Sequence, residues 1–171
     1  RPGAAAWAAS LAGIELQWRV PLGKGYPGPV MDGDRVLVSP GTVVRFEVRR
    51  TPVIRLVQVA GTLRFARDRS TELNVALLKV QAGNRCTERG FACDFHGANR
   101  AGEPNVLPTG EMPTLEVGTL QDPIPEKHTA RIRLHFSEGM DEDDAPALVC
   151  CSARMELHGA PGAVQVHRIV G

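Results

Sequence analysis

The sequence predicts an all-β protein, folded as a β-coil or solenoid-like domain with a long inserted loop. Three observations lead to this class. The 171 residues include 18 glycines and 13 prolines, an excess that is typical of a chain with many turns. Short stretches alternate apolar and polar residues, which is the pattern of half-buried strands. Glycines also recur at a nearly regular spacing where these strands end.

The first residues of the chain show little periodic pattern. We expect residues 1–30 to form an N-terminal segment and regular structure to begin near Asp32. Trp7 and Trp18 are expected to pack on the body of the domain. The small apolar residues 4–11 fit either a short helix or loop packed on the first strand or the remainder of a signal region. We expect the chain to be part of a longer protein.

The clearest strand–corner–strand unit is IRLVQVAGTLRF at residues 54–65. Val57 and Val59 alternate with a glutamine, which predicts that they face the same side of one strand. Beyond the Gly-Thr corner, Leu63 and Phe65 are predicted to face inward from a second strand, with an arginine between them. The unit is therefore one strand, a sharp corner and a second strand.

Related units precede and follow this one. Alternating stretches run from residue 36 to 48 and from residue 73 to 80, and corner glycines fall at Gly41, Gly61 and Gly83. A repeat of about 20 residues with this content is typical of a stacked coil, in which each repeat adds one rung. A sandwich of successive hairpins is the alternative arrangement.

The later part of the chain interrupts the rhythm and then resumes it. Residues 84–113 carry several Gly and Pro and are predicted to be the inserted loop. Residues 130–136 show the clearest alternation in the chain, residues 138–144 are predicted to be an acidic loop, and residues 148–157 a last strand region.

A row of basic residues is the first candidate for a binding site. Arg131, Arg133 and His135 alternate with apolar residues and are predicted to be exposed, with Arg45 and Arg64 on neighbouring strands. Planar guanidinium groups suit the carboxylates or sulfates of acidic polysaccharide. The sequence therefore indicates a ligand-binding row that runs across the rungs.

Acidic residues leave other interpretations open. The same arginines fit an ordinary solvated face that Glu47 and Glu116 balance. Glu156 and His158 are predicted to share the outward face of the last strand, within reach of acid–base chemistry. The alternative for His158 is a structural hydrogen bond to a turn.

Cys86 and Cys93 flank part of the predicted loop. In a secreted protein we expect a disulfide between them that pins this loop. A zinc site that includes Asp94 and His96 is the alternative, and it lacks a second cysteine pair. We therefore predict no metal site.

The vicinal pair Cys150 and Cys151 is expected to point to opposite faces of a strand, so one of the two thiols lies in the core. A disulfide from this core thiol to one of the loop cysteines is an alternative that the sequence leaves open.

Composition and motifs exclude several functions. The formal net charge is +1, so no bulk electrostatic field points to nucleic acid or an anionic membrane. No apolar run approaches the roughly 18 residues that cross a bilayer. No phosphate-binding glycine loop, nucleophile elbow or zinc-protease helix occurs. The acidic run 141–144 is expected to be an exposed loop, with calcium binding as the alternative. We predict no cofactor.

Taken in order, several short segments carry a family likeness. They are GDRV at 33–36, PGTV at 40–43, VAGTLRF at 59–65, LEVGT at 115–119 and DPI at 122–124. This ordered set resembles the eight-glycine (G8) domain of extracellular proteins, a family with hyaluronidase-like and bacterial secreted members. MELHGAP at 155–161 resembles the segment that leads from this domain into a right-handed parallel β-helix.

The resemblance implies a fold of the right-handed β-helix type and three parts of the chain. These are the N-terminal segment 1–30, the β domain 31–147 and the start of a following β-helix region, 148–171. It further implies an extracellular or cell-surface location.

The function that the resemblance implies is a non-catalytic module that binds or presents carbohydrate, hyaluronan among the candidates, within a larger protein. Its implied partners are acidic polysaccharide and the downstream β-helix domain of the same protein. We expect no enzymatic activity from this chain alone. The alternatives are the N-terminal part of a polysaccharide-degrading, hyaluronidase-like enzyme and a structural cap of a β-helix.

Overall fold

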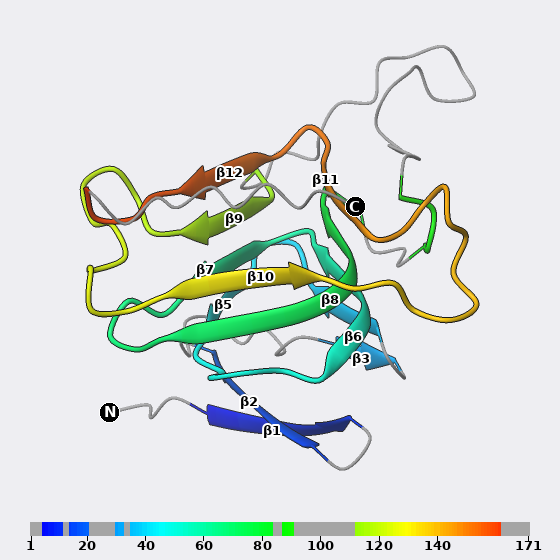
Figure 1. The fold of residues 1–171 in the computed structure, drawn as a ribbon, viewed down its shortest axis with the longest axis horizontal. Coiled ribbons are helices and arrows are strands. Elements are labelled where there is room, and N and C mark those ends of the chain that lie inside the picture. The colour runs from blue at the N-terminus through cyan, green and yellow to red at the C-terminus, as the bar shows by residue number, and fades with distance from the viewer. Residues whose placement is uncertain are drawn as a thin grey trace.

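The structure, a computed structural model, describes residues 5–11, 14–20, 30–32, 35–83, 87–90 and 112–161. Every regular element in these ranges is a β-strand, and the strands form two six-stranded sheets (Figure 1). The described residues contain no helix of the length and apolar character that a membrane crossing requires. The predicted all-β class is confirmed.

One sheet, here called sheet A, has the strand order β1-β2-β5-β7-β9-β12, and the other, sheet B, has the order β10-β8-β6-β4-β3 with β11 also paired to β8. The strands are β1 (Ala5–Leu11), β2 (Ile14–Val20), β3 (Val30–Asp32), β4 (Arg35–Val38), β5 (Val43–Phe46), β6 (Val53–Val59), β7 (Thr62–Phe65), β8 (Thr71–Val80), β9 (Thr114–Val117), β10 (Ala130–Leu134), β11 (Ala147–Cys150) and β12 (Arg154–Leu157).

From β4 to β9, successive strands of the chain alternate between the two sheets, and each pair of strands forms one rung of the coil. The chain passes from β4 to β5, from β6 to β7 and from β8 to β9, and equivalent strands of successive rungs pair in parallel. Val57, for example, lies between Val36 and Leu78 in sheet B. Figure 1 shows the resulting two layers of strands side by side. The stacked coil is confirmed, and these parallel pairs exclude a sandwich of successive hairpins.

The core lies between the two sheets. In the predicted unit, Val57, Val59, Leu63 and Phe65 are at most 1% exposed, as their alternation predicts. The rings of Phe65 and Phe46 pack with centroids 4.7 Å apart. The remaining buried core residues come from the same positions of other rungs: Val36, Val38, Val44, Ile54, Leu73, Val75, Leu78, Val80 and Leu115.

The N-terminal end of the coil differs from the prediction. Residues 1–30 were expected to lack strands, but β1 and β2 form an antiparallel hairpin whose second strand pairs with β5. β3 pairs antiparallel with β4 at the same end of sheet B. The alanine-rich sequence of β1 has low strand propensity, so its pairing depends on neighbours that a local pattern does not show. The side chains of Trp7 and Trp18 lie outside the description.

Loops cover the outer face of sheet B. Of the predicted inserted loop, residues 87–90 and 112–113 are described. Met140 of the acidic loop and Ala145, which follows the loop, are buried against Leu56 and Leu77. Val75 and Leu78 of β8 face the core, whereas Leu77 faces outward. The inward pattern of β8 therefore shifts by one residue at this point. The pattern of β6 shifts with it between Ile54 and Val57, since the two strands keep one register throughout.

β10 and β11 pair end to end along the single long strand β8. Together with β12, which pairs with β9, they form the last rung of the described coil. Residues 148–157 thus belong to the same two sheets as the earlier rungs, while the assignment of the coil to the right-handed β-helix type stays a prediction.

Candidate functional site

The predicted basic row is divided between the two sheets. Arg131 and Arg133 lie on β10, which pairs with β8 in sheet B. Arg45 and Arg64 are neighbours on β5 and β7 of sheet A. The prediction of one row across rungs is therefore wrong, because successive strands of the coil alternate between sheets and the two pairs of arginines fall on different ones.

On sheet B, three arginines converge on one carboxylate. Arg50 Nε lies 2.7 Å from Glu72 Oε1, while Arg131 Nη1 and Arg133 Nε lie 3.0 and 3.3 Å from Glu72 Oε2. The side chain of Glu72 is 7% exposed, whereas those of the three arginines are 69%, 48% and 49% exposed. In the described part of the chain these arginines form no ion pair with another carboxylate. We call Arg50, Arg131, Arg133 and Glu72 the arginine cluster.

Glu72 is ionised at neutral pH. Hydrogen bonds from Arg50 and then Arg131 lower its pKa to about 2, against the opposing effect of burial. Asn74 Nδ2 also donates to Glu72, at 3.3 Å, and to the carbonyl oxygen of Thr51 at 3.0 Å. The Asn74 Oδ1 atom is therefore the acceptor that faces His135 Nε2 at 2.8 Å. His135 thus joins the arginine cluster through Asn74.

Sequence reasoning missed Arg50, Glu72 and Asn74. The register places Glu72 opposite Arg131 and Asn74 opposite Arg133 on the neighbouring strand. Their alternation with leucine and valine was visible in the sequence and indicated a shared face. Which strand would lie beside it was not visible, because residues 81–129 separate β8 from β10 in the chain.

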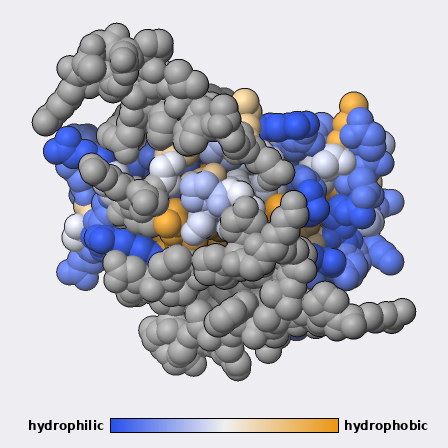
Figure 2. Space-filling view, turned by 180° about the vertical axis from the view of Figure 1, so that it is seen from behind, coloured by the Kyte–Doolittle hydropathy of each residue, from blue (hydrophilic) through white to orange (hydrophobic). Residues whose placement is uncertain are grey.

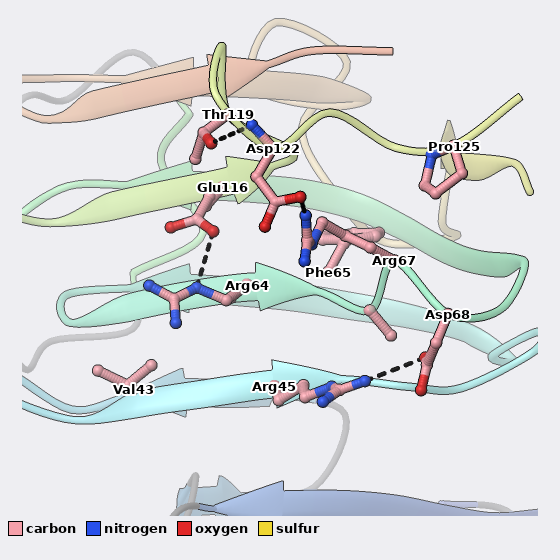
Figure 3. Close-up of a pocket in the computed structure, with 11 residues that line it drawn as sticks. Val43, Arg45, Arg64, Phe65, Arg67, Asp68, Glu116, Thr119, Asp122 and Pro125 are labelled. Atoms are coloured by element: carbon pink, nitrogen blue, oxygen red, sulfur yellow. Dashed lines mark hydrogen bonds and ion pairs between the residues drawn. The ribbon is translucent and has the colours of Figure 1, made fainter. Parts of the chain in front are cut away.

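On sheet A, a groove of about 860 Å³ opens on the outer face of the coil. Figure 3 shows its floor on β5, β7 and β9, with the loop that carries Thr119, Asp122 and Pro125 along one side. Arg45 and Arg64 rise from the floor, and Arg67 and Asp68 lie where the chain leaves β7. Seven of the eleven lining residues are thus charged or polar, and the other four add apolar surface.

Ion pairs balance the arginines on this floor. Arg64 Nε lies 2.7 Å from Glu116 Oε1, and Arg45 Nε lies 2.8 Å from Glu47 Oε1. The solvated face balanced by these two glutamates, one of the interpretations of the sequence, therefore describes sheet A.

The rim of the groove is paired in the same way. Asp68 accepts from Arg45 Nη2 at 3.0 Å, and hydrogen bonds from Arg69 and then Arg45 lower the pKa of Asp68 to about 2. Arg67 forms an ion pair with Asp122. Asp122 is itself held in a turn, where its backbone N–H donates to Thr119 Oγ1 at 3.1 Å.

Glu156 and His158 have different neighbours. Glu156 lies beside Glu116 in the register of sheet A and pairs with Arg154. The backbone N–H of His158 donates to the carbonyl oxygen of Val117 at 2.9 Å, and His158 also lines a cavity at the end of the coil. Among the described residues, no hydrogen bond joins the side chains of Glu156 and His158, so the structure does not show them as an acid–base pair.

That cavity, here called the end cavity, has a volume of about 730 Å³. Its walls come from β10 and β11, from the ends of β9 and β12, and from the segment that precedes β10. Leu134 and Leu157 on its wall are 43% and 55% exposed. Its other apolar walls are Val117, Ile124, Ile132 and Leu148. Seen from behind, the described surface is mostly hydrophilic, with a few apolar residues between the polar ones (Figure 2).

The two cysteines of the predicted loop disulfide, Cys86 and Cys93, lie outside the described residues. Cys151 is 3% exposed and disulfide-bonded, whereas Cys150 is exposed and free. The prediction that one of the vicinal cysteines is in the core is confirmed. Because Cys150 is free, the cysteine bonded to Cys151 lies outside the described residues.

Within the described ranges, no three His, Cys, Asp or Glu side chains are grouped so that they could hold a metal ion. Asp94 and His96, the other members of the alternative zinc site, lie outside these ranges. In the acidic loop, Asp141 Oδ1 accepts from the backbone N–H of Asp143 at 3.0 Å and Asp144 Oδ1 from that of Gly90 at 2.9 Å. These two carboxylates thus accept hydrogen bonds from backbone N–H groups of the loops.

Comparison with known proteins places the chain in a family. The model of the G8 domain matches residues 22–169. Fibrocystin of Mus musculus is 29% identical over 141 residues, which cover 82% of this chain and 2% of that protein. Fibrocystin of Canis lupus familiaris is 27% identical over 140 residues, which cover 78% of this chain and 3% of that protein. No solved structure matches. The chain belongs to the G8 domain family.

Proposed function

We propose that this chain is a non-catalytic module of a larger extracellular or cell-surface protein, in which it binds acidic polysaccharide through the arginine cluster. The observation that carries the proposal is that three half-exposed guanidinium groups share the single carboxylate of Glu72. The extracellular proteins in which G8 domains occur support the location. The relatives, of which the chain spans only 2% and 3%, support a larger protein.

The charges of the arginine cluster favour an anionic ligand. Three positive charges face one negative charge, so the cluster retains two positive charges. A guanidinium group has five N–H donors in a planar fork that matches carboxylate and sulfate oxygens. Each arginine uses only part of this fork on Glu72, and its exposure leaves the remaining donors accessible to a ligand.

The arrangement along the strand suits a polymer. Arg131 and Arg133 occupy alternate positions of β10, which places them on one face about 7 Å apart. Two anionic groups of one chain can therefore each meet an arginine. Glu72 holds the side chains in place before the ligand arrives, which reduces the entropy lost on binding.

Titration with a heparin-derived and a hyaluronan oligosaccharide tests this proposal. The wild-type chain is expected to bind at low ionic strength and to lose affinity as salt is added. The double variant Arg131→Gln/Arg133→Gln should weaken binding by at least about tenfold, the effect of roughly one charge-assisted hydrogen bond. Arg154→Gln is the matched control, because Arg154 is 63% exposed and ion-paired on the other sheet. Equal affinity of the double variant and the wild type would exclude the arginine cluster as the site.

The end cavity favours a second candidate function, a structural role within the same protein. β10 and β12 are edge strands of the two sheets, and within the described residues no further rung pairs with them. Their outer edges and the apolar walls of the cavity therefore lie at the end of the described coil. Stacking of the downstream β-helix domain would cover both, since exposed strand edges otherwise invite uncontrolled pairing.

Hydrogen exchange distinguishes this role. In a longer piece of the protein that includes the downstream region, the amides of β10 and β12 should become more protected than in this chain alone. Unchanged protection would rule out stacking at this end. The same longer piece, assayed for depolymerisation of hyaluronan beside this chain, tests the hyaluronidase-like alternative.

A further inference from the structure

We propose that the groove on sheet A is a separate binding site for a neutral, hydroxyl-rich oligosaccharide. This goes beyond the proposed binding of acidic polysaccharide, because the groove lies on the other sheet and has a different charge balance. Figure 3 shows the residues that line the groove on β5, β7 and β9 and on the loop that carries Asp122. Its volume of about 860 Å³ lies in the range of small-ligand sites.

The first argument is that the arginines of the groove are already matched. Arg64 pairs with Glu116 at 2.7 Å and Arg45 pairs with Asp68 at 3.0 Å. The third arginine of the lining, Arg67, forms an ion pair with an aspartate of the bounding loop. Three arginines thus face three carboxylates, and an anionic ligand would meet no excess of positive charge here, in contrast to the arginine cluster.

The second argument concerns what such pairs still offer a ligand. Arg64 uses its Nε on Glu116 Oε1, which leaves guanidinium N–H donors and a second carboxylate oxygen beside each other. Two neighbouring hydroxyl groups of a sugar can donate to the carboxylate and accept from the guanidinium at the same time. The ion pair stays intact, so no charge is left unpaired when the ligand binds. A charged ligand would instead add a charge that no excess of opposite charge in the groove balances.

The third argument is the regular spacing of these groups. The register places Arg45, Arg64, Glu116 and Glu156 in line across four neighbouring strands. Parallel strands lie about 4.8 Å apart, so polar groups recur at this interval across the groove. An oligosaccharide also repeats its hydroxyl groups ring by ring. At the edge of the groove, Pro125 offers an apolar surface for the C–H face of a sugar ring.

Titration of the whole chain with cellohexaose and mannohexaose, followed by NMR at low and high ionic strength, tests the proposal. At least one of these neutral probes is expected to shift backbone amide signals of β5, β7 and β9, with an affinity that salt leaves nearly unchanged. The double variant Arg64→Leu/Glu116→Leu removes both members of one pair and leaves no lone charge. It should weaken binding by about tenfold, as expected for the loss of two hydrogen bonds.

The control variant Arg131→Gln/Arg133→Gln is expected to bind the neutral probe as the wild type does. The two proposals can therefore be tested independently. Loss of acidic-oligosaccharide binding in the control variant concerns only the arginine cluster and does not change the neutral-probe binding expected at the groove. The groove proposal is overturned if neither neutral probe binds, if the Arg64/Glu116 double variant binds equally well, or if the shifted amides lie outside sheet A.

Discussion

Arg64 and Glu116 lie directly opposite each other on the parallel strands β7 and β9, and their side chains form an ion pair of 2.7 Å. The side chain of Arg64 is 51% exposed and that of Glu116 is 16% exposed. Cross-strand ion pairs with this exposure contribute about 0.2–1 kcal/mol. In a double-mutant cycle of Arg64→Gln and Glu116→Gln, urea unfolding should therefore give a coupling energy below about 1 kcal/mol. A clearly larger coupling would mean that the pair is chiefly a structural element of sheet A.

Gly61 is required by the close approach of two rungs. A Cβ atom at this position would lie 2.3 Å from the carbonyl oxygen of Ser39 and 2.4 Å from that of Thr42. The backbone of Gly61 cannot easily move away, because its N–H donates to Val38 and its carbonyl oxygen accepts from Thr114. Gly61→Ala is therefore expected to destabilise the fold by about 3 kcal/mol in urea unfolding, near the upper end of overpacking effects.

Gly139→Ala is the comparison for this variant. A Cβ atom there meets only Arg55 Nη2, at 3.9 Å, although φ is +77°. The variant should lose about 1–2 kcal/mol from backbone conformation alone. A loss at Gly61 no greater than the loss at Gly139 would contradict the steric argument.

The rungs were predictable because their pattern is local. Val36 and Val38, like Val57 and Val59, alternate with polar or less buried residues, and all four are fully buried. Alternate residues of a strand point to the same face of its sheet, so apolar residues at every second position identify the face that is buried. The corner at Gly61 follows in the same way from its place between two such strands.

The candidate sites were less predictable because they depend on long-range register. Arg131 was expected beside Arg64, but its neighbour is Glu72 in the other sheet. No local pattern states which sheet a strand joins or how an inserted segment sets its register. The outward position of Leu77 has a similar origin, since this side chain packs against Met140 and Ala145 of a distant segment.

The arginine cluster predicts how stability depends on pH. The pKa of Glu72 is about 2 in the folded protein, below its ordinary value of 4.5, because Arg50 and Arg131 donate hydrogen bonds to it. Its contribution to stability is therefore complete above pH 4.5 and is lost as the pH falls toward 2. Urea unfolding at a series of pH values should show a shallower loss of stability for Glu72→Gln than for the wild type. Parallel curves in this window would contradict the shifted pKa. Glu88, whose pKa is also about 2, remains in both proteins and cancels in the difference.

The same substitution makes a prediction for binding. Glu72→Gln removes the only carboxylate that the described residues place against Arg50, Arg131 and Arg133. The positive charge of the cluster then rises by one, and the affinity for a heparin-derived oligosaccharide should rise severalfold at low ionic strength. Glu116→Gln on sheet A is the matched control and should leave this affinity unchanged. Weaker binding by a Glu72→Gln variant that is fully folded would contradict this prediction. It would mean that Glu72 serves mainly to position the arginines.

The disulfide of Cys151 predicts how the chain is cross-linked. Cys151 is bonded and Cys150 is free, and the sequence offers only two further cysteines, Cys86 and Cys93. Peptide mapping without reduction should therefore recover the Cys151 peptide joined to one of these two, a bond that excludes one between Cys86 and Cys93. Cys151→Ser should cost about 2–4 kcal/mol of stability, because a long loop of the unfolded chain is no longer closed. Cys150→Ser, at an exposed position, should change stability by less than about 0.5 kcal/mol. Recovery of a Cys86–Cys93 peptide with a free Cys151 would instead support the pairing expected from the sequence.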